Sequence, residues 1–317
     1  MTRPRSTIVS LVDTPYYHCI SRCVRRAFLC GKDRFSGKSF EHRKPWLVDR
    51  LRHLSSVFAI DIAAYAVMSN HYHLVVHIDK HRCQTWTENE VIDRWLQLYK
   101  GPDLIHRYNK AEPLHSAEKD KIKEIVEIWR SRLSSISWFM ACLNEFIARK
   151  ANVEDCCKGR FWEGRFKSKA LLDVTALLST MAYVGLNPVR AGIASNLNNS
   201  NFTSIQDRIR EVSKQGIKGK PSLMIFSESK MQDEHITTIP FHLKDYIDLV
   251  DWTGRIVRKN KRGKIPAHEP SMLSQLKLSP SQWIYLSLEI QKRSINTIHG
   301  LEKVKSWEKQ QAKDKAA

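Results

Sequence analysis

The stretch IDIAAYAVMSNHYHLVVHI, residues 60–78, decides the predicted fold. Its first nine residues are mostly apolar, which indicates a buried strand. Ser69 and Asn70 follow and favour a turn, because serine and asparagine side chains can hydrogen-bond to nearby backbone. Residues 71–78 then predict a second strand beside the first. The stretch therefore predicts a β-hairpin.

The chain on either side of the hairpin predicts further strands and helices. They are a strand at 16–23, a helix from Trp46, a helical insertion at 80–133, a helix at 134–152, a strand at 160–172, a helix from Asp173 to Asn187 and a helix from about Pro280. Asp173 is a favourable N-cap, and Pro188 disfavours a helical Asn187. Without the insertion, the order β-α-β-β-α-β plus one helix predicts an α+β, ferredoxin-like core. Its helices would cover one face of the sheet and leave the other face open for a site.

The length of 317 residues suggests two parts, at ~150 residues per domain. We expect a core over residues 12–195 and a basic C-terminal extension over residues 196–317, an accessory DNA-binding region. Residues 254–266, GRIVRKNKRGKIP, hold six cations and no acid. Gly254 and Gly263 favour a loop there, which would serve either as a DNA contact or as ordinary solvated surface.

The charge balance points to a polyanionic partner. Lys and Arg number 52 and Asp and Glu number 33, so the formal net charge is +19. Nucleic acid is the expected partner, because each phosphate bound by Lys or Arg releases condensed counterions. No run of ~20 apolar residues predicts a transmembrane helix or a membrane partner. Seven cysteines without a CxxC pair are typical of free thiols, so we expect a cytoplasmic protein.

Two histidines, a tyrosine and an asparagine are the candidates for chemistry. His71 and His73 are two apart on a predicted strand and so share one face. They are either two ligands of one metal ion or a pair of histidines without that role. On the helix that begins with an aspartate N-cap, Tyr183 and Asn187 lie one turn apart, on a face away from the core. Tyr183 is a candidate nucleophile or a residue at the rim of the core, and Asn187 is a candidate oxygen ligand. We expect His77 to lie behind the ligands or at the surface.

Several ordered motifs together resemble a known family. They are YYHCISRC (16–23), MSNHYH (68–73), FWEGRFK (161–167) and YVGLNPVRAG (183–192). Their order and content resemble the HUH-type single-tyrosine transposases, and most closely the REP-associated tyrosine transposases. The resemblance covers residues 12–195, interrupted by the insertion. It implies a metal-dependent strand transferase that acts on single-stranded DNA.

The same resemblance implies roles for individual residues. His71 and His73 would be metal ligands, Asn187 the third ligand and Tyr183 the nucleophile. The bound ion would be Mg²⁺ or Mn²⁺, since imidazole with an amide oxygen suits Mn²⁺, and Mg²⁺ is the more available ion. The transposase would cleave and rejoin DNA at hairpin or repeat sequences through a covalent phosphotyrosine. The alternative is a catalytically inactive regulator that binds repeat DNA.

Basic side chains along the predicted core and extension are candidates for binding DNA. They are Arg22, Arg25, Arg26, Arg165, Lys167, Lys169, Arg190, Arg255, Arg258, Lys259, Lys261 and Arg262. Trp162 and Phe166 would either stack on bases or belong to the core. We expect the partner to be single-stranded, hairpin or palindromic-repeat DNA in the bacterial cytoplasm, associated with the nucleoid. The protein would be a monomer or a homodimer.

Overall fold

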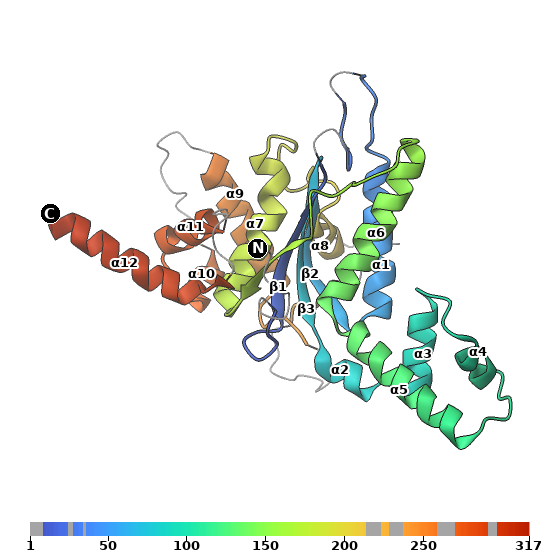
Figure 1. Ribbon diagram of the computed structural model, residues 1–317. Coiled ribbons are helices and arrows are strands. Elements are labelled where there is room, and N and C mark those ends of the chain that lie inside the picture. The colour runs from blue at the N-terminus through green and yellow to red at the C-terminus, as the bar shows by residue number, and fades with distance from the viewer. Residues whose placement is uncertain are drawn as a thin grey trace.

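The computed structural model describes residues 9–24, 28–33, 36–213, 223–227, 237–258, 270–290 and 297–316. Its centre is a five-stranded sheet with the order β2-β3-β1-β4-β5 (Figure 1). The strands are β1 (Tyr16–Arg22), β2 (Ile60–Val67), β3 (His71–Ile78), β4 (Lys167–Leu171) and β5 (Thr297–Ile298). All neighbours pair antiparallel except β4 and β5, which are parallel. The α+β class and the hairpin of β2 and β3 are confirmed.

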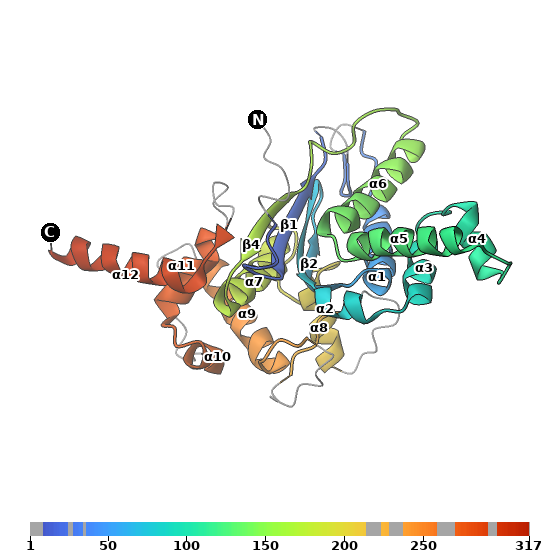
Figure 2. The ribbon, with the colours of Figure 1, turned by 60° about the horizontal axis from the view of Figure 1, so that its bottom comes forward.

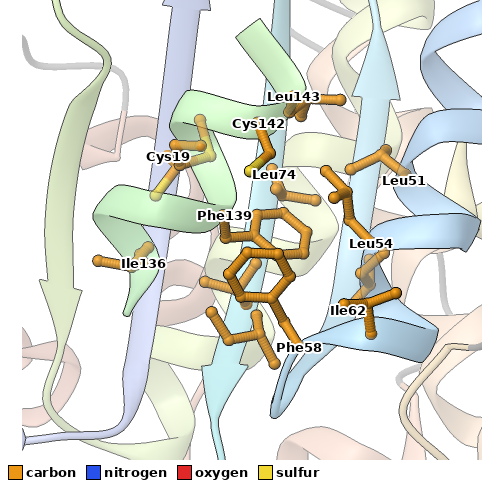
Figure 3. Packing of buried hydrophobic residues seen from close by; sticks show 14 of the residues in the cluster. Cys19, Leu51, Leu54, Phe58, Ile62, Leu74, Ile136, Phe139, Cys142 and Leu143 are labelled. Atoms are coloured by element: carbon orange, nitrogen blue, oxygen red, sulfur yellow. The ribbon is translucent and has the colours of Figure 1, made fainter. Parts of the chain in front are cut away.

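Helices α1 (Arg43–Val57) and α6 (Ile136–Glu154) cover one face of the sheet. Apolar residues at helical spacing on both helices meet inward-facing residues of β1, β2 and β3 (Figure 3). Phe58, just after α1, meets Phe139 of α6 edge to face, with ring centroids 5.4 Å apart. Burial of such side chains contributes ~1.5–3 kcal/mol each. This layer therefore anchors the strands that carry the histidines.

Helix α7 (Val174–Arg190) covers the opposite face of the sheet, so the prediction that this face is open is wrong (Figure 1). β2 has small side chains on this face, and the helix packs against them with Ala176 and Thr180, which are fully buried. Small residues on both sides let the helix lie close to the sheet. We expected the helix face that carries Tyr183 and Asn187 to point away from the core, yet Ala176 and Thr180, which begin that face, are buried against the sheet.

The predicted end of this helix at Asn187 is also wrong, because α7 continues through Pro188 to Arg190. A proline ring removes one backbone donor. Here it stands in the last turn, and the next turn closes regardless, since the amide of Ala191 donates to the carbonyl of Asn187 (2.9 Å). The proline therefore costs one hydrogen bond near the helix end and does not terminate the helix.

Residues after α7 form helices that pack behind it. They are α8 (Ser204–Val212), α9 (Leu243–Arg258), α10 (Ser271–Gln275), α11 (Pro280–Glu289) and α12 (Gly300–Ala316). The helix expected from about Pro280 is confirmed as α11, with Ser279 as its N-cap. β5 and α12 follow, and α12 projects away from the sheet (Figure 2).

A loop was expected to begin at Gly254. Residues 254–258 instead form the last part of α9. A Cβ at Gly254 would lie 2.8 Å from Cδ2 of Leu186. The glycine is therefore the point of close approach between α9 and α7, and it does not mark a flexible segment. Residues 259–269, which hold the rest of the basic run, lie outside the described residues.

Residues 80–133 form helices on the far side of the molecule from α12 (Figure 2). They are α2 (Lys80–Thr85), α3 (Glu88–Leu96), α4 (Asp103–Asn109) and α5 (Ser116–Leu133). Their own core includes stacked Trp95 and Trp129, with ring centroids 5.3 Å apart. None of the helices in the described part of the chain has the length and apolar character needed to cross a bilayer.

Candidate active site

The pairing of β1 with β3 determines which side chains share the face under α7. Ile20 lies opposite His73, and Arg22 lies opposite His71. Directly opposed residues of an antiparallel pair project to the same side of the sheet. The face below α7 therefore carries both predicted histidines together with His18 and Arg22. The shared face of His71 and His73 is as the alternation predicts.

His18 and His73 make a direct hydrogen bond between their rings. His18 Nε2 lies 2.9 Å from His73 Nδ1. Their exposed fractions are 1% and 3%. Burial lowers the pKa of His18 to about 3, with a smaller effect from Lys169. Burial, with His18 and His71 beside it, also holds the pKa of His73 well below its usual range. Both rings are therefore neutral at physiological pH.

His71 stands at the start of β3 and is half-buried. Its ring centroid lies 4.9 Å from that of His73, with the planes at 79°. Its Nδ1 is 2.7 Å from Oδ1 of Asn70, the turn residue before the strand. An amide oxygen can only accept, so Nδ1 carries the proton and Nε2 has the lone pair. Burial, and then Arg22, lower the pKa of His71 to about 4.

Tyr183 projects from α7 toward these histidines. Its ring meets His73 edge to face, with centroids 5.5 Å apart, and lies 6.2 Å from the ring of His18. Cζ of Arg190, two turns further along the helix, lies 5.4 Å from the centre of the Tyr183 ring. Burial lowers the pKa of Arg190, and the proximity of Tyr183 opposes that effect. The geometry thus places a phenol beside imidazoles and a guanidinium.

Asn187 lies one turn after Tyr183, and both are half-buried. The Asn187 amide nitrogen donates to the backbone carbonyl of Tyr183 (3.3 Å). That bond directs the nitrogen back along the helix. Within the described residues, Asn187 makes no hydrogen bond to His71 or His73. The ring of Tyr183, by contrast, contacts the ring of His73.

Two of the predicted metal ligands, His71 and His73, lie together on this face. His73 Nε2 is buried and has no hydrogen-bond partner within the described residues, and such a nitrogen is costly to leave unpaired. Neutral imidazole is the form that ligates metal, and both histidines are neutral. Within the same residues, no group of three or more His, Cys, Asp or Glu side chains could hold a metal. The predicted set includes only two such side chains and takes its third ligand from Asn187.

The candidate DNA-binding residues are distributed around this face and beyond it. Arg22 lies beside His71, and Arg165 and Lys167 are exposed just before β4 and at its first residue. Lys169 is half-buried, and its Nζ donates to the carbonyl of Ile290 (3.1 Å). Arg255 is exposed on α9 and forms an ion pair with Asp251 (2.6 Å).

Other predicted DNA-binding residues lie outside the described part of the structure. They are Arg25, Arg26, Lys259, Lys261 and Arg262, together with the side chain of Arg258. Of the predicted set, Arg22, Arg190, Lys167 and Lys169 thus share the α7 side of the sheet with the histidines.

Trp162 and Phe166, the two aromatic residues considered for base stacking, lie away from Tyr183. Trp162 Nε1 donates to the carbonyl of Asn144 on α6 (2.8 Å), and its ring meets Tyr72. These partners belong to the opposite face of the sheet from the histidines. Phe166 is 9% exposed and belongs to the core. The core alternative holds for Phe166, and Trp162 is partly buried against the core.

Two histidines outside the predicted ligand set also line this face. His77 is buried, with Nδ1 3.1 Å from Oδ2 of Asp61, and its ring lies 4.9 Å from that of Tyr16. It is therefore not at the surface, and its partners in the described residues are Asp61 and Tyr16, not the two candidate ligands. Sequence reasoning missed His18. Its signal was the alternation of YYHCISR, which puts His18 on the face of Arg22, but the pairing register was needed to connect it with His73.

Comparison with known proteins adds little. No protein-family model matches the chain, and no curated protein matches it. A solved structure of a REP-associated tyrosine transposase bound to a REP hairpin is similar to this chain at 10% identity and a TM-score of 0.35. That match covers 66% of this chain and 93% of the other. A likeness this weak assigns neither a fold nor a function.

Proposed function

We propose that this protein is a metal-dependent DNA strand transferase that cleaves and rejoins single-stranded DNA at hairpin or repeat sequences. Tyr183 would be the nucleophile, and strands β1 to β4 with α1 and α6 would form a ferredoxin-like core of the HUH type. One observation carries the proposal. The Tyr183 ring lies 5.5 Å from that of His73, whose Nε2 is buried and unpaired within the described residues.

His71, His73 and Asn187 would hold Mg²⁺ or Mn²⁺. When bound, such an ion polarises a scissile phosphate and neutralises the charge that develops on it. The chain contributes two neutral imidazoles from one rigid strand, held by burial and by their neighbours. Placement of ligands on a strand fixes their geometry better than placement on a loop.

The covalent step follows from the phenol. Tyr183 Oη forms a bond to phosphorus while the bond from phosphorus to the DNA 3′ oxygen breaks. The phenol proton ends on the released 3′ oxygen, and the 5′ phosphate of the other DNA fragment stays linked to Tyr183. A phenol is a weak nucleophile until it loses its proton. The Arg190 guanidinium, 5.4 Å from the ring, would stabilise the phenolate. A free 3′-OH can reverse the reaction, because the phosphotyrosine keeps the bond energy.

The charge around the site supports a nucleic-acid substrate. Arg22 and Lys167 lie on the same face of the sheet as the histidines. Arg22 is the last residue of β1, and Lys167 is the first residue of β4. The chain as a whole has a formal net charge of +19. Cations beside a nucleophile orient a phosphodiester without reading its sequence.

A denaturing gel with labelled single-stranded hairpin DNA and Mn²⁺ tests the proposal. The unchanged protein should form a covalent adduct, and Tyr183→Phe should form none while it still binds the DNA. Tyr16→Phe is the matched control, because Tyr16 lies on the same sheet face against His77. DNA binding without any adduct in the unchanged protein would instead support the inactive regulator.

A further inference from the structure

We propose that His18 is a positioning residue that fixes the tautomer of His73 for metal binding, which rests on the metal-dependent function proposed above. The planes of the two rings differ by only 22°, with centroids 5.1 Å apart, so the facing ring nitrogens can share a proton in the ring plane. Their hydrogen bond joins His18 Nε2 to His73 Nδ1 at 2.9 Å. It connects β1 to β3 beneath the helix that carries Tyr183.

The hydrogen bond between the two rings determines which nitrogen of His73 carries the proton. A neutral imidazole has one N–H and one lone pair. If His18 Nε2 donates, His73 accepts at Nδ1, carries its own proton on Nε2 and cannot ligate there. If His73 Nδ1 donates, His73 Nε2 presents a lone pair toward the site. Metal binding at His73 Nε2 therefore requires His18 to accept at Nε2 and to keep its own proton on Nδ1.

The surroundings leave this choice to the pair itself. His18 Nδ1 and His73 Nε2 are both buried without a hydrogen-bond partner in the described part of the chain. No hydrogen bond from the protein in that part therefore fixes one arrangement or the other. A metal ion at His73 Nε2 would favour the arrangement in which His73 and His18 each carry their proton on Nδ1. Hydrogen-bond partners of ligating histidines orient the ring, and their loss typically weakens metal binding 10- to 100-fold.

Two variants of His18 separate an acceptor role from a packing role. His18→Phe keeps a ring of similar size and removes the acceptor. His18→Gln removes the ring and can place an amide oxygen near the position of Nε2. Mn²⁺ affinity, measured by electron paramagnetic resonance without DNA, should fall about 10- to 100-fold in His18→Phe and change less than about threefold in His18→Gln.

The reverse order, with Phe tolerated and Gln not, would show that only the ring volume matters and would overturn the proposal. Circular dichroism and thermal unfolding confirm that each variant folds. Should His18→Phe not fold, nitrogen NMR of the unchanged protein with ¹⁵N-labelled histidine and Zn²⁺ decides the question. We expect His18 to show a protonated Nδ1 and an unprotonated Nε2, and a protonated Nε2 would overturn the role.

The metal measurements distinguish this inference from the proposed function. Absence of saturable Mn²⁺ binding in the unchanged protein would overturn both. Equal Mn²⁺ affinity in all three proteins would overturn only the role of His18. A missing DNA adduct despite the expected order of Mn²⁺ affinities would overturn the strand-transfer reaction and leave the role of His18 intact.

Discussion

The guanidinium of Arg190 lies over the ring of Tyr183, with Cζ 5.4 Å from its centroid. Both residues belong to α7, seven positions apart, so the helix itself sets their relation. The sheet below contributes the imidazole of His73, whose ring meets the phenol edge to face. The candidate nucleophile thus contacts a cation from its own helix and a histidine from β3.

Removal of this cation should slow the covalent step. We expect Arg190→Gln to lower the single-turnover rate of adduct formation about 10- to 100-fold on pre-bound DNA, because the phenolate loses a stabilising charge. Arg190→Lys should retain part of the rate. Arg149→Gln is the control, since Arg149 is exposed on α6 and pairs with Glu145. Equal rates in the Gln variant and the unchanged protein would remove Arg190 from the mechanism.

The metal ligands should be separable from DNA binding. His71→Ala and His73→Ala should each abolish cleavage and leave most binding intact, and EDTA should stop the unchanged protein. Asn187→Ala should be milder than Asn187→Leu, because water can replace an oxygen ligand only if there is room for it. His81→Ala, at an exposed position, is the control. Full cleavage in EDTA would end the metal hypothesis.

Stability should depend on pH through His18. Its pKa is about 3 in the folded chain and ~6.5 when unfolded, so the unfolded state binds more protons between these values. Its contribution is complete above about pH 6.5 and is lost as the pH falls toward 3. In urea titrations between pH 4.5 and 6, His18→Gln should reduce the slope of unfolding free energy against pH by about 1.4 kcal/mol per unit. An unchanged slope in His18→Gln would contradict this.

Asp173 should stabilise two helices at once. Its Oδ1 accepts from the amide of Ala176 (2.7 Å), and its Oδ2 accepts from that of Leu301 at the start of α12 (3.2 Å). Asp173→Ala should lower the free energy of unfolding by about 2 kcal/mol, and Asp173→Asn by less. Ser135→Ala is a matched control, because Ser135 is the N-cap of α6 and makes no side-chain cap bond. A loss no larger than that control would contradict the double cap.

The contribution of the basic run 254–266 to DNA binding should be visible in the salt dependence of the DNA affinity. If it touches about four phosphates, replacement of its six cations by Gln should reduce the slope of log K against log salt by about three to four units. The covalent step on pre-bound DNA should be little changed. Arg255→Gln alone should have almost no effect, because Asp251 already pairs with it. Identical slopes would assign the run to solvated surface.

The regular elements were accessible from sequence because their signals are local. β3 at 71–78 has the predicted bounds, and α6 differs from the predicted helix by two residues at each end. Alternation and helical spacing depend only on neighbours in the chain. The shared face of His71 and His73 follows from the same local rule.

The errors share a cause, which is packing between distant segments. Gly254 suggested a loop, yet it is the contact of α9 with Leu186. Pro188 suggested a helix end, yet α7 continues because its turns are held between the sheet and the later helices. Within a helix, glycine costs ~1 kcal/mol and proline ~3 kcal/mol relative to alanine, and burial along a whole helix outweighs such penalties.

By itself, the sequence determined most of the strands and helices up to α7, the common direction of His71 and His73, and the single turn between Tyr183 and Asn187. Those relations lie within one element, whose backbone geometry is nearly fixed. The tertiary structure alone decided that α7 lies on the histidine face, that Tyr183 meets His73, and that His18 bonds to His73. Such contacts depend on strand register and on helix packing, where a shift of one residue turns every side chain of a strand to the other face.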